Sequence, residues 1–115
     1  MPDESVEPLP TVTIAWLLWH LTWWWGNAHR WSDGRNSLAP DDVLWPGSAG
    51  QAVAEVVRLH DSWADVLVRG EPQASTSAPF AAGKTLAGLA AWVNFELTKN
   101  LAEIGVLVTL QRNLA

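Results

Sequence analysis

Three side chains in this sequence have the chemistry of a metal site or of a buried polar network: His20, Glu96 and Asn100. His20 lies in an almost wholly apolar run from Ile14 to Trp25. Glu96 and Asn100 are four residues apart, so on a helix their side chains lie one above the other. A histidine and a carboxylate form an incomplete ligand set for a divalent transition metal, and an asparagine adds only a weak neutral oxygen. If the helices that carry them pack together, a metal site in the core is predicted.

The same residues also have a simpler interpretation. A buried carboxylate is costly unless it is paired, and Lys99 follows Glu96 by three residues. A hydrogen-bond network with Lys99 or with a tryptophan N–H would satisfy Glu96 without a metal, and the spacing alone favours this alternative. A lone histidine in an apolar helix is, likewise, more often a packed core residue than a ligand. The residue types therefore leave both interpretations open.

A further motif, APFAAGKT from Ala78 to Thr85, fits the permissive form of a phosphate-binding loop. That chemistry needs a buried strand before the loop, so that backbone N–H groups curl round the phosphate. The preceding PQASTS is not such a strand. We therefore interpret Gly83 as a loop residue and Thr85 as a helix cap.

The apolar periodicity predicts an all-α chain that places these side chains on helices. The expected helices cover residues 13–28, 48–68 and 85–112. Candidate N-caps precede them: Thr11 or Thr13, then Ser48 in a capping box with Gln51, then Thr85. The first helix is expected to fray or end near Gly26. The connection after Trp31 is long for a bundle, which suggests a functional role or a short helical turn within it.

Composition limits the function classes. The 115 residues include 7 Lys and Arg and 12 Asp and Glu, a net charge of −5 that argues against nucleic-acid binding. The absence of cysteine excludes disulfides and thiolate sites. The apolar run is shorter than the roughly 20 residues that span a bilayer, and the acidic, proline-bearing start is unlike a signal peptide. We expect a cytoplasmic protein with no membrane partner, built from an extended lead-in (1–10) and one helical domain (11–115).

The segments AWLLWHLTWWW, in the first expected helix, and WVNFELTKNLAEIGVLVTLQRN, in the last, resemble the DinB/YfiT-like superfamily. The resemblance implies a four-helix bundle in up-down-down-up order with an internal metal site. That site combines a histidine of a W-H-L turn with two histidines four apart in the last helix, the first of which is glutamate in one branch. His20 and Glu96 match this pattern. Asn100 departs from it, because it stands where the second histidine belongs, directly after Lys99.

The chain also departs from the family in length. It begins almost directly at the W-H-L helix, so we expect a DinB-like bundle with three main helices and the usual N-terminal helix missing. The first helix, apolar nearly all round, should then leave an uncovered face, and such faces usually mean association. We therefore predict a homodimer in which the second subunit covers this helix. A truncated form of a longer protein is the alternative.

Two functions compete. The favoured one is a non-catalytic or weakly metal-binding small-molecule or stress-associated bundle, because Asn100 and Lys99 weaken the ligand set. The alternative, implied by the resemblance, is a divalent-metal enzyme of the thiol transferase, isomerase or hydrolase type. His20 and Glu96 would then hold zinc, nickel or iron, and a thiol would be the cosubstrate. A pocket near His20 is expected to be lined by three tryptophans: Trp16, Trp23 and Trp24.

Overall fold

The protein is described by a computed structural model, which covers residues 13–114. Three long helices dominate it: α1 (Ile14–Ser32), α2 (Ala49–Arg69) and α3 (Leu86–Leu114). Two short 3-10 turns, η1 (Pro40–Asp42) and η2 (Ala81–Gly83), lie in the connections. Over this range no strand forms beyond an isolated bridge between Ser75 and Thr85, which confirms the all-α prediction. The expected lead-in, residues 1–10, lies outside the described residues.

The helix starts follow the predicted caps. Thr13 Oγ1 accepts a hydrogen bond from the Trp16 backbone N–H at 3.0 Å, and Ser48 Oγ accepts one from the Gln51 N–H at 3.2 Å. Thr85 Oγ1 does the same for the Gly88 N–H at 3.2 Å. Each cap satisfies a donor that the first helical turn leaves unpaired. The alternative cap, Thr11, lies outside the described residues.

The end of α1 was predicted wrongly. The helix does not end near Gly26 or at Ala28 but continues to Ser32. A glycine in a helix costs about 1 kcal/mol relative to alanine. The extra turn buries Ala28 and Trp31 in the core, and burying one large apolar side chain gains more than that. Tertiary packing therefore outweighs the local preference of Gly26.

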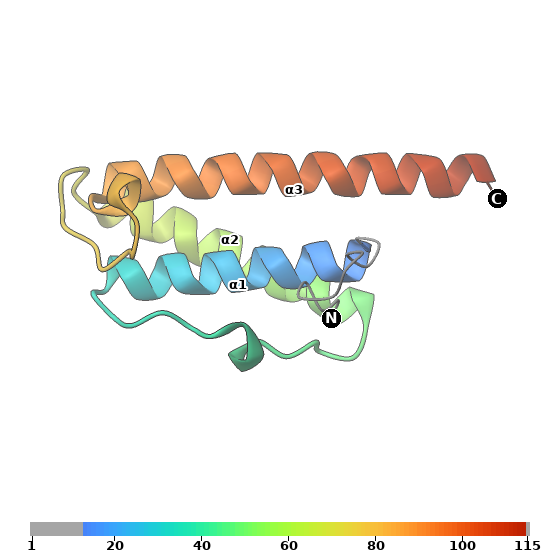
Figure 1. Cartoon of the computed structure of the whole chain (residues 1–115), viewed down its shortest axis with the longest axis horizontal. Coiled ribbons are helices and arrows are strands. Elements are labelled where there is room, and N and C mark those ends of the chain that lie inside the picture. Colours follow the sequence, from blue (N-terminus) through green and yellow to red (C-terminus); the bar gives the residue numbers. More distant parts are fainter. Residues whose placement is uncertain (1–12, 115) are drawn as a thin grey trace.

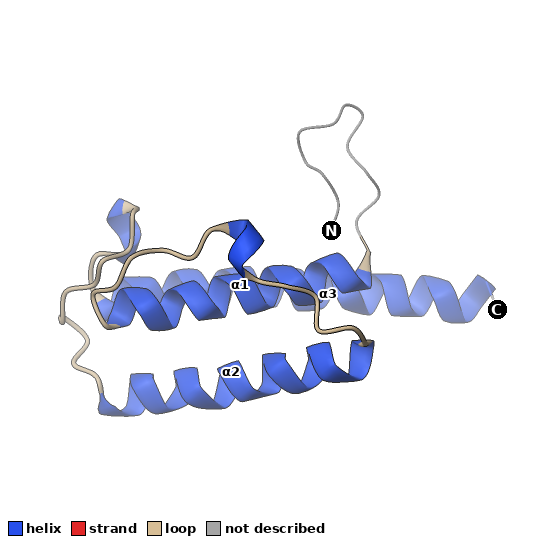
Figure 2. Ribbon diagram, turned by 90° about the horizontal axis from the view of Figure 1, so that it is seen from below, coloured by secondary structure: helices blue, strands red, loops and turns tan. Residues whose placement is uncertain are grey.

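The three helices form a bundle with one long crossover. Figure 1 shows α1 and α2 running in the same direction, joined by residues 33–48, which return along the length of the bundle. α3 runs antiparallel to both helices, and α1 packs against each of its neighbours (Figures 1 and 2). This order matches the last three helices of an up-down-down-up bundle. The core cluster gathers near the end of the bundle where α1 finishes and α3 begins: Trp25, Ala28, Trp31, Leu59, Trp63, Ala78, Leu86, Leu89 and Val93.

The crossover 33–48 covers the side of α1 that the two other helices leave free. Trp19 Nε1 donates to the Val43 carbonyl at 2.7 Å, and Trp23 Nε1 donates to the Leu38 carbonyl at 3.2 Å. The Leu38 backbone N–H donates in turn to Asn27 Oδ1 at 2.6 Å. Every residue of α1 is therefore buried or half-buried. The connection thus has a structural role, and it includes the short turn η1.

The expectation of an uncovered first helix is accordingly wrong. The exposed large apolar side chains lie on the crossover, on α2 and on α3: Leu44, Val53, Val57, Leu67, Val68, Phe95, Leu101, Val106, Leu110 and Leu114. In Figure 1, α3 continues past the first turn of α1, and half of these residues belong to α3. Within residues 13–114, none of the helices combines the length and hydropathy that crossing a membrane requires.

Candidate functional site

The polar centre of the bundle lies where α1 meets α3. His20 Nε2 is 3.8 Å from Glu96 Oε2, and Lys99 Nζ is 3.8 Å from the same oxygen. The Glu96 carboxylate is nearly buried, whereas the Lys99 side chain is 52% exposed. Glu96 and Lys99 are three residues apart on α3, which places both beside one side chain of α1. The structure thus brings His20 and Glu96 together, with Lys99 as the neighbouring cation.

Asn100 occupies the core face of α3 one turn beyond Glu96. Only 1% of its surface is exposed, and its amide nitrogen Nδ2 has no hydrogen-bond partner among residues 13–114. An unpaired buried amide donor costs free energy, so this position is not optimised as a closed network. An asparagine offers a metal one neutral amide oxygen, and its amide NH2 group is a hydrogen-bond donor that cannot bind a cation. Asn100 is therefore in the place of a ligand without the chemistry of a good one.

His20 has a partner that the sequence analysis missed. Trp24 Nε1 donates a hydrogen bond to His20 Nε2 at 2.6 Å. An indole nitrogen can only donate, so Nε2 must accept and the ring proton is on Nδ1, which is buried without a partner among the described residues. The lone pair that would bind a metal is thus already used. The spacing of four residues between His20 and Trp24 was the available signal, since such pairs meet on one helix face.

The protonation state agrees with this geometry. Burial and, as the smaller cause, the nearby positive charge of Lys99 together lower the pKa of His20 to about 4. At neutral pH the imidazole is therefore uncharged. Because it carries no charge, it cannot balance the Glu96 carboxylate, and Lys99 is left as the cation beside that group.

The tryptophans expected near His20 do surround it. The ring centroids of Trp16, Trp23 and Trp24 lie 4.6, 6.2 and 6.2 Å from the imidazole centroid. The Trp19 ring is 6.5 Å away. These rings shield the imidazole, whose side chain is 18% exposed. Exclusion of water by the indoles is the physical cause of the lowered pKa.

The residues present do not fit a tightly held divalent metal. Among the described residues, no group of three or more His, Asp or Glu side chains is arranged to hold one. His20 Nε2 accepts the Trp24 N–H, and a lysine ammonium lies beside the one carboxylate. Bound metals in proteins usually have at least three protein ligands, with deprotonated donors free to coordinate. This site offers two candidate donors, and one of them is engaged.

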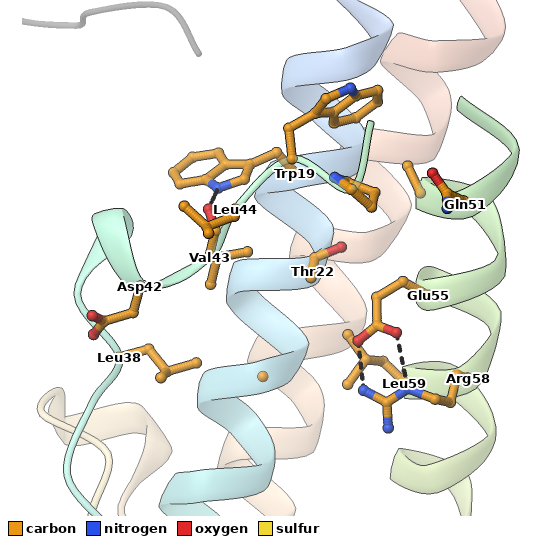
Figure 3. A pocket seen from close by; sticks show the side chains of 14 residues that line it. Trp19, Thr22, Leu38, Asp42, Val43, Leu44, Gln51, Glu55, Arg58 and Leu59 are labelled. Atoms are coloured by element: carbon orange, nitrogen blue, oxygen red, sulfur yellow. Dashed lines mark hydrogen bonds and ion pairs between the residues drawn. The ribbon is translucent and has the colours of Figure 1, made fainter. Parts of the chain in front are cut away.

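A cavity of about 410 Å³ lies on another side of α1, between α1, α2 and the crossover (Figure 3). Its lining is mostly apolar: Trp19, Thr22, Gly26, Leu38, Asp42, Val43, Leu44, Trp45, Pro46, Gln51, Ala52, Glu55, Arg58 and Leu59. Trp16, Trp23 and Trp24 do not line this cavity. The sequence analysis missed it because its outer wall is the crossover, whose path depends on hydrogen bonds to residues far away in the chain.

The phosphate-loop motif has no matching site. Residues 78–85 contain the turn η2 and end directly before α3, and the Thr76 hydroxyl donates to the Gly83 carbonyl. The segment before it contributes only the bridge at Ser75 in place of the buried strand that the chemistry needs. Thr85 caps α3, in agreement with the simpler interpretation.

The comparison with known families agrees with this architecture. The DinB superfamily model matches residues 6–104, which is most of the chain. No curated protein and no solved structure matches the sequence significantly. The match spans α1, α2 and the part of α3 that carries Glu96 and Asn100. This chain belongs to the DinB superfamily.

Proposed function

We propose that this chain is a non-catalytic DinB-superfamily bundle that binds a small molecule and holds no tightly bound metal. The observation that carries the proposal is the hydrogen bond from Trp24 Nε1 to His20 Nε2, 2.6 Å long. This bond takes the lone pair that the family resemblance assigns to a metal. Catalysis of the family type would require that metal. Because Nε2 of His20 already accepts a hydrogen bond, we infer a binding role.

The charges around Glu96 support the same proposal. A metal ion between His20 and Glu96 would approach Lys99, whose ammonium is 3.8 Å from the carboxylate oxygen. Two cations competing for one carboxylate repel each other. Lys99 is tethered to the same helix, so its effective concentration at Glu96 does not depend on the free metal level. The lysine therefore supplies the positive charge that a metal supplies in other sites.

A metal-dependent enzyme is the second candidate, and one observation favours it. His20 and Glu96 come from different helices and still converge to 3.8 Å, as two ligands of one ion would. Movement of the Trp24 indole would free Nε2. A metal held there would act as a Lewis acid that lowers the pKa of a thiol cosubstrate. No cysteine of this chain could act as the nucleophile.

Metal content tests the choice between the two candidates. The purified protein is incubated with zinc, nickel or ferrous iron, dialysed, and analysed by elemental mass spectrometry. We expect much less than one equivalent of metal, and the same melting temperature before and after treatment with a chelator. His20→Ala and its control His60→Ala, an exposed histidine on α2, are measured in parallel. One equivalent of metal that is lost in His20→Ala and retained in His60→Ala would refute the non-catalytic proposal.

We also propose that the chain is a cytoplasmic homodimer. The exposed large apolar side chains on α2 and α3 support association, because apolar surface is costly to leave in water. Because the residues of α1 are buried or half-buried, we place the proposed dimer contact on α2 and α3. Sedimentation equilibrium at micromolar concentration should give twice the chain mass, and a monomer without a bound partner would contradict the proposal.

A further inference from the structure

We propose that the cavity between α1, α2 and the crossover is the ligand site, and that it binds a neutral aromatic molecule with a hydrogen-bond donor. This inference rests on the proposed small-molecule function and names its site and ligand class. The cavity, about 410 Å³, falls in the range of small-molecule sites, roughly 300–1,000 Å³. It is distinct from the His20 centre, which faces α3.

The outer wall of the cavity is fixed in place. The crossover is attached to α1 at Val43 and at Leu38 by the indole N–H groups of Trp19 and Trp23. Asn27, fully buried, accepts the Leu38 N–H at 2.6 Å. A wall held at two points costs little ordering entropy when a ligand enters, so the site is preorganised.

The walls favour an aromatic ligand. Two tryptophans line the cavity, Trp45 and Trp19, the second of which is labelled in Figure 3. Leu38, Val43 and Leu59 provide aliphatic surface. Leu44 lines the cavity with 81% of its surface exposed. A flat apolar molecule in the cavity would bury this surface and stack on the indoles.

The charged lining residues favour a neutral ligand. Arg58 donates to Glu55 through two nitrogens, with Nε to Oε2 at 2.9 Å, so the two charges cancel. Asp42 Oδ2 accepts the Ala39 backbone N–H at 2.9 Å, and in Figure 3 its carboxylate points away from Thr22 and Glu55. An anionic or cationic ligand would have to compete with the Glu55–Arg58 pair for its partner. A neutral ligand leaves that pair intact.

One polar group faces the inside of the cavity. Thr22 Oγ1 donates to the Leu18 carbonyl at 3.0 Å, which leaves its oxygen as an acceptor, and in Figure 3 this oxygen points towards α2. Gln51 contributes an amide at the other side, with Oε1 accepting from Ser48 Oγ. A ligand N–H or O–H would donate a hydrogen bond to Thr22 Oγ1. For this reason we propose a ligand that carries a hydrogen-bond donor.

Binding is tested with two fluorescent probes that share one aromatic skeleton. N-phenyl-1-naphthylamine is neutral and has an N–H donor, and 8-anilinonaphthalene-1-sulfonate adds a sulfonate to the same skeleton. We expect saturable binding of the neutral probe in a blue-shifted state, and binding of the sulfonate at least about tenfold weaker. Tighter binding of the sulfonate, or no saturable binding of the neutral probe, would overturn the proposed ligand class.

Two matched pairs of variants locate the probe. Gly26 lines the cavity, where an added Cβ would lie 3.2 Å from Leu38 Cδ1, whereas a Cβ at Gly105 meets nothing within 4 Å. Gly26→Leu should weaken binding at least about tenfold by filling the space, and Gly105→Leu should not. Leu44→Ala should weaken it about threefold or more, while Val68→Ala, at an equally exposed site (84%), should not.

The outcomes separate the site from the function. Melting curves by circular dichroism confirm that each variant folds, and Leu44→Ala keeps the test valid if Gly26→Leu does not fold. Unchanged affinity in both folded cavity variants would overturn the site. A metal-free protein that binds the neutral probe independently of Leu44 and Gly26 would retain the proposed function and refute only this location.

Discussion

The hydrogen bond between Trp24 and His20 is testable by one substitution, Trp24→Phe. Phenylalanine keeps an aromatic ring in the core but removes the indole N–H that His20 Nε2 accepts. Both ring nitrogens of His20 would then be unpartnered, because Nδ1 already has no partner among the described residues. The matched control is Trp16→Phe, since the Trp16 ring packs on the same imidazole at 4.6 Å while Nε2 is bonded to Trp24.

The expected loss of stability follows from two contributions. Leaving a buried acceptor without a donor costs about 1–3 kcal/mol. The smaller ring also loses part of its contact with Trp31 and Trp92, whose centroids lie 6.0 and 6.1 Å from Trp24, which adds about 1 kcal/mol. The total is about 2–4 kcal/mol. For a chain of this size each kcal/mol moves the melting temperature by about 4–8 °C, so Trp24→Phe should melt at least about 8 °C lower.

A second measurement separates the hydrogen bond from simple packing. Burial and Lys99 remain in this variant, but a donor to the neutral imidazole favours the neutral form, so its removal should raise the pKa of His20 above about 4. NMR titration of the His20 ring protons measures this value, and Trp16→Phe should change it less. If Trp24→Phe leaves the pKa at about 4 and loses no more stability than Trp16→Phe, the hydrogen bond does not hold the imidazole, and the argument against a metal loses its main support.

Three further predictions concern the same centre. Asn100→His should restore a three-ligand set and raise zinc affinity at least about tenfold in a competition assay, whereas Asn94→His, at an exposed position of α3, should not. Lys99→Ala removes the cation beside Glu96, so both the zinc affinity and the pKa of His20 should rise. Isothermal titration measures the affinity and NMR measures the pKa, and no change in either would contradict the role given to Lys99. The folded-state pKa of His20 is about 4, whereas the ordinary pKa of histidine is 6.5. The contribution of the neutral imidazole to stability is therefore complete above about pH 6.5 and is lost as the pH falls towards 4. Urea unfolding should therefore show a loss of about 2 kcal/mol from this group between about pH 7.5 and pH 5, absent in His20→Phe, and an equal pH dependence in both proteins would disprove it.

The helices could be predicted because their signals are local. Thr13, Ser48 and Thr85 each cap a helix whose apolar residues repeat at helical spacing, and such signals act within one or two turns. The convergence of His20 and Glu96 followed from the family resemblance, and the geometry now gives it a distance of 3.8 Å. Gly26 failed as an end signal because burial of Trp31 depends on α2 and α3, which a local pattern does not contain.

The cavity and the cover of α1 could not be predicted for a related reason. Both depend on the path of residues 33–48, which is set by contacts between Trp19 and Val43 and between Trp23 and Leu38, 24 and 15 residues apart. Composition shows the tryptophans but not which carbonyl each indole will meet. Trp16, Trp23 and Trp24, which were assigned to a pocket near His20, all surround it. The tryptophans that line the cavity, Trp19 and Trp45, were assigned to no site.

The cavity and the His20 centre are separate, so small-molecule binding in the cavity does not depend on a metal at His20. A metal site built on α1 and α3 requires charged donors, whereas Lys99 is a cation and Asn100 offers only a neutral amide. The cavity between α1, α2 and the crossover needs none of those donors, because its walls are indoles and aliphatic side chains and its charges are paired. Trp19 contacts both sites, with its ring near His20 and its N–H on the crossover. Loss of the metal chemistry would thus leave the cavity intact, provided that Trp19 keeps its hydrogen bond to Val43.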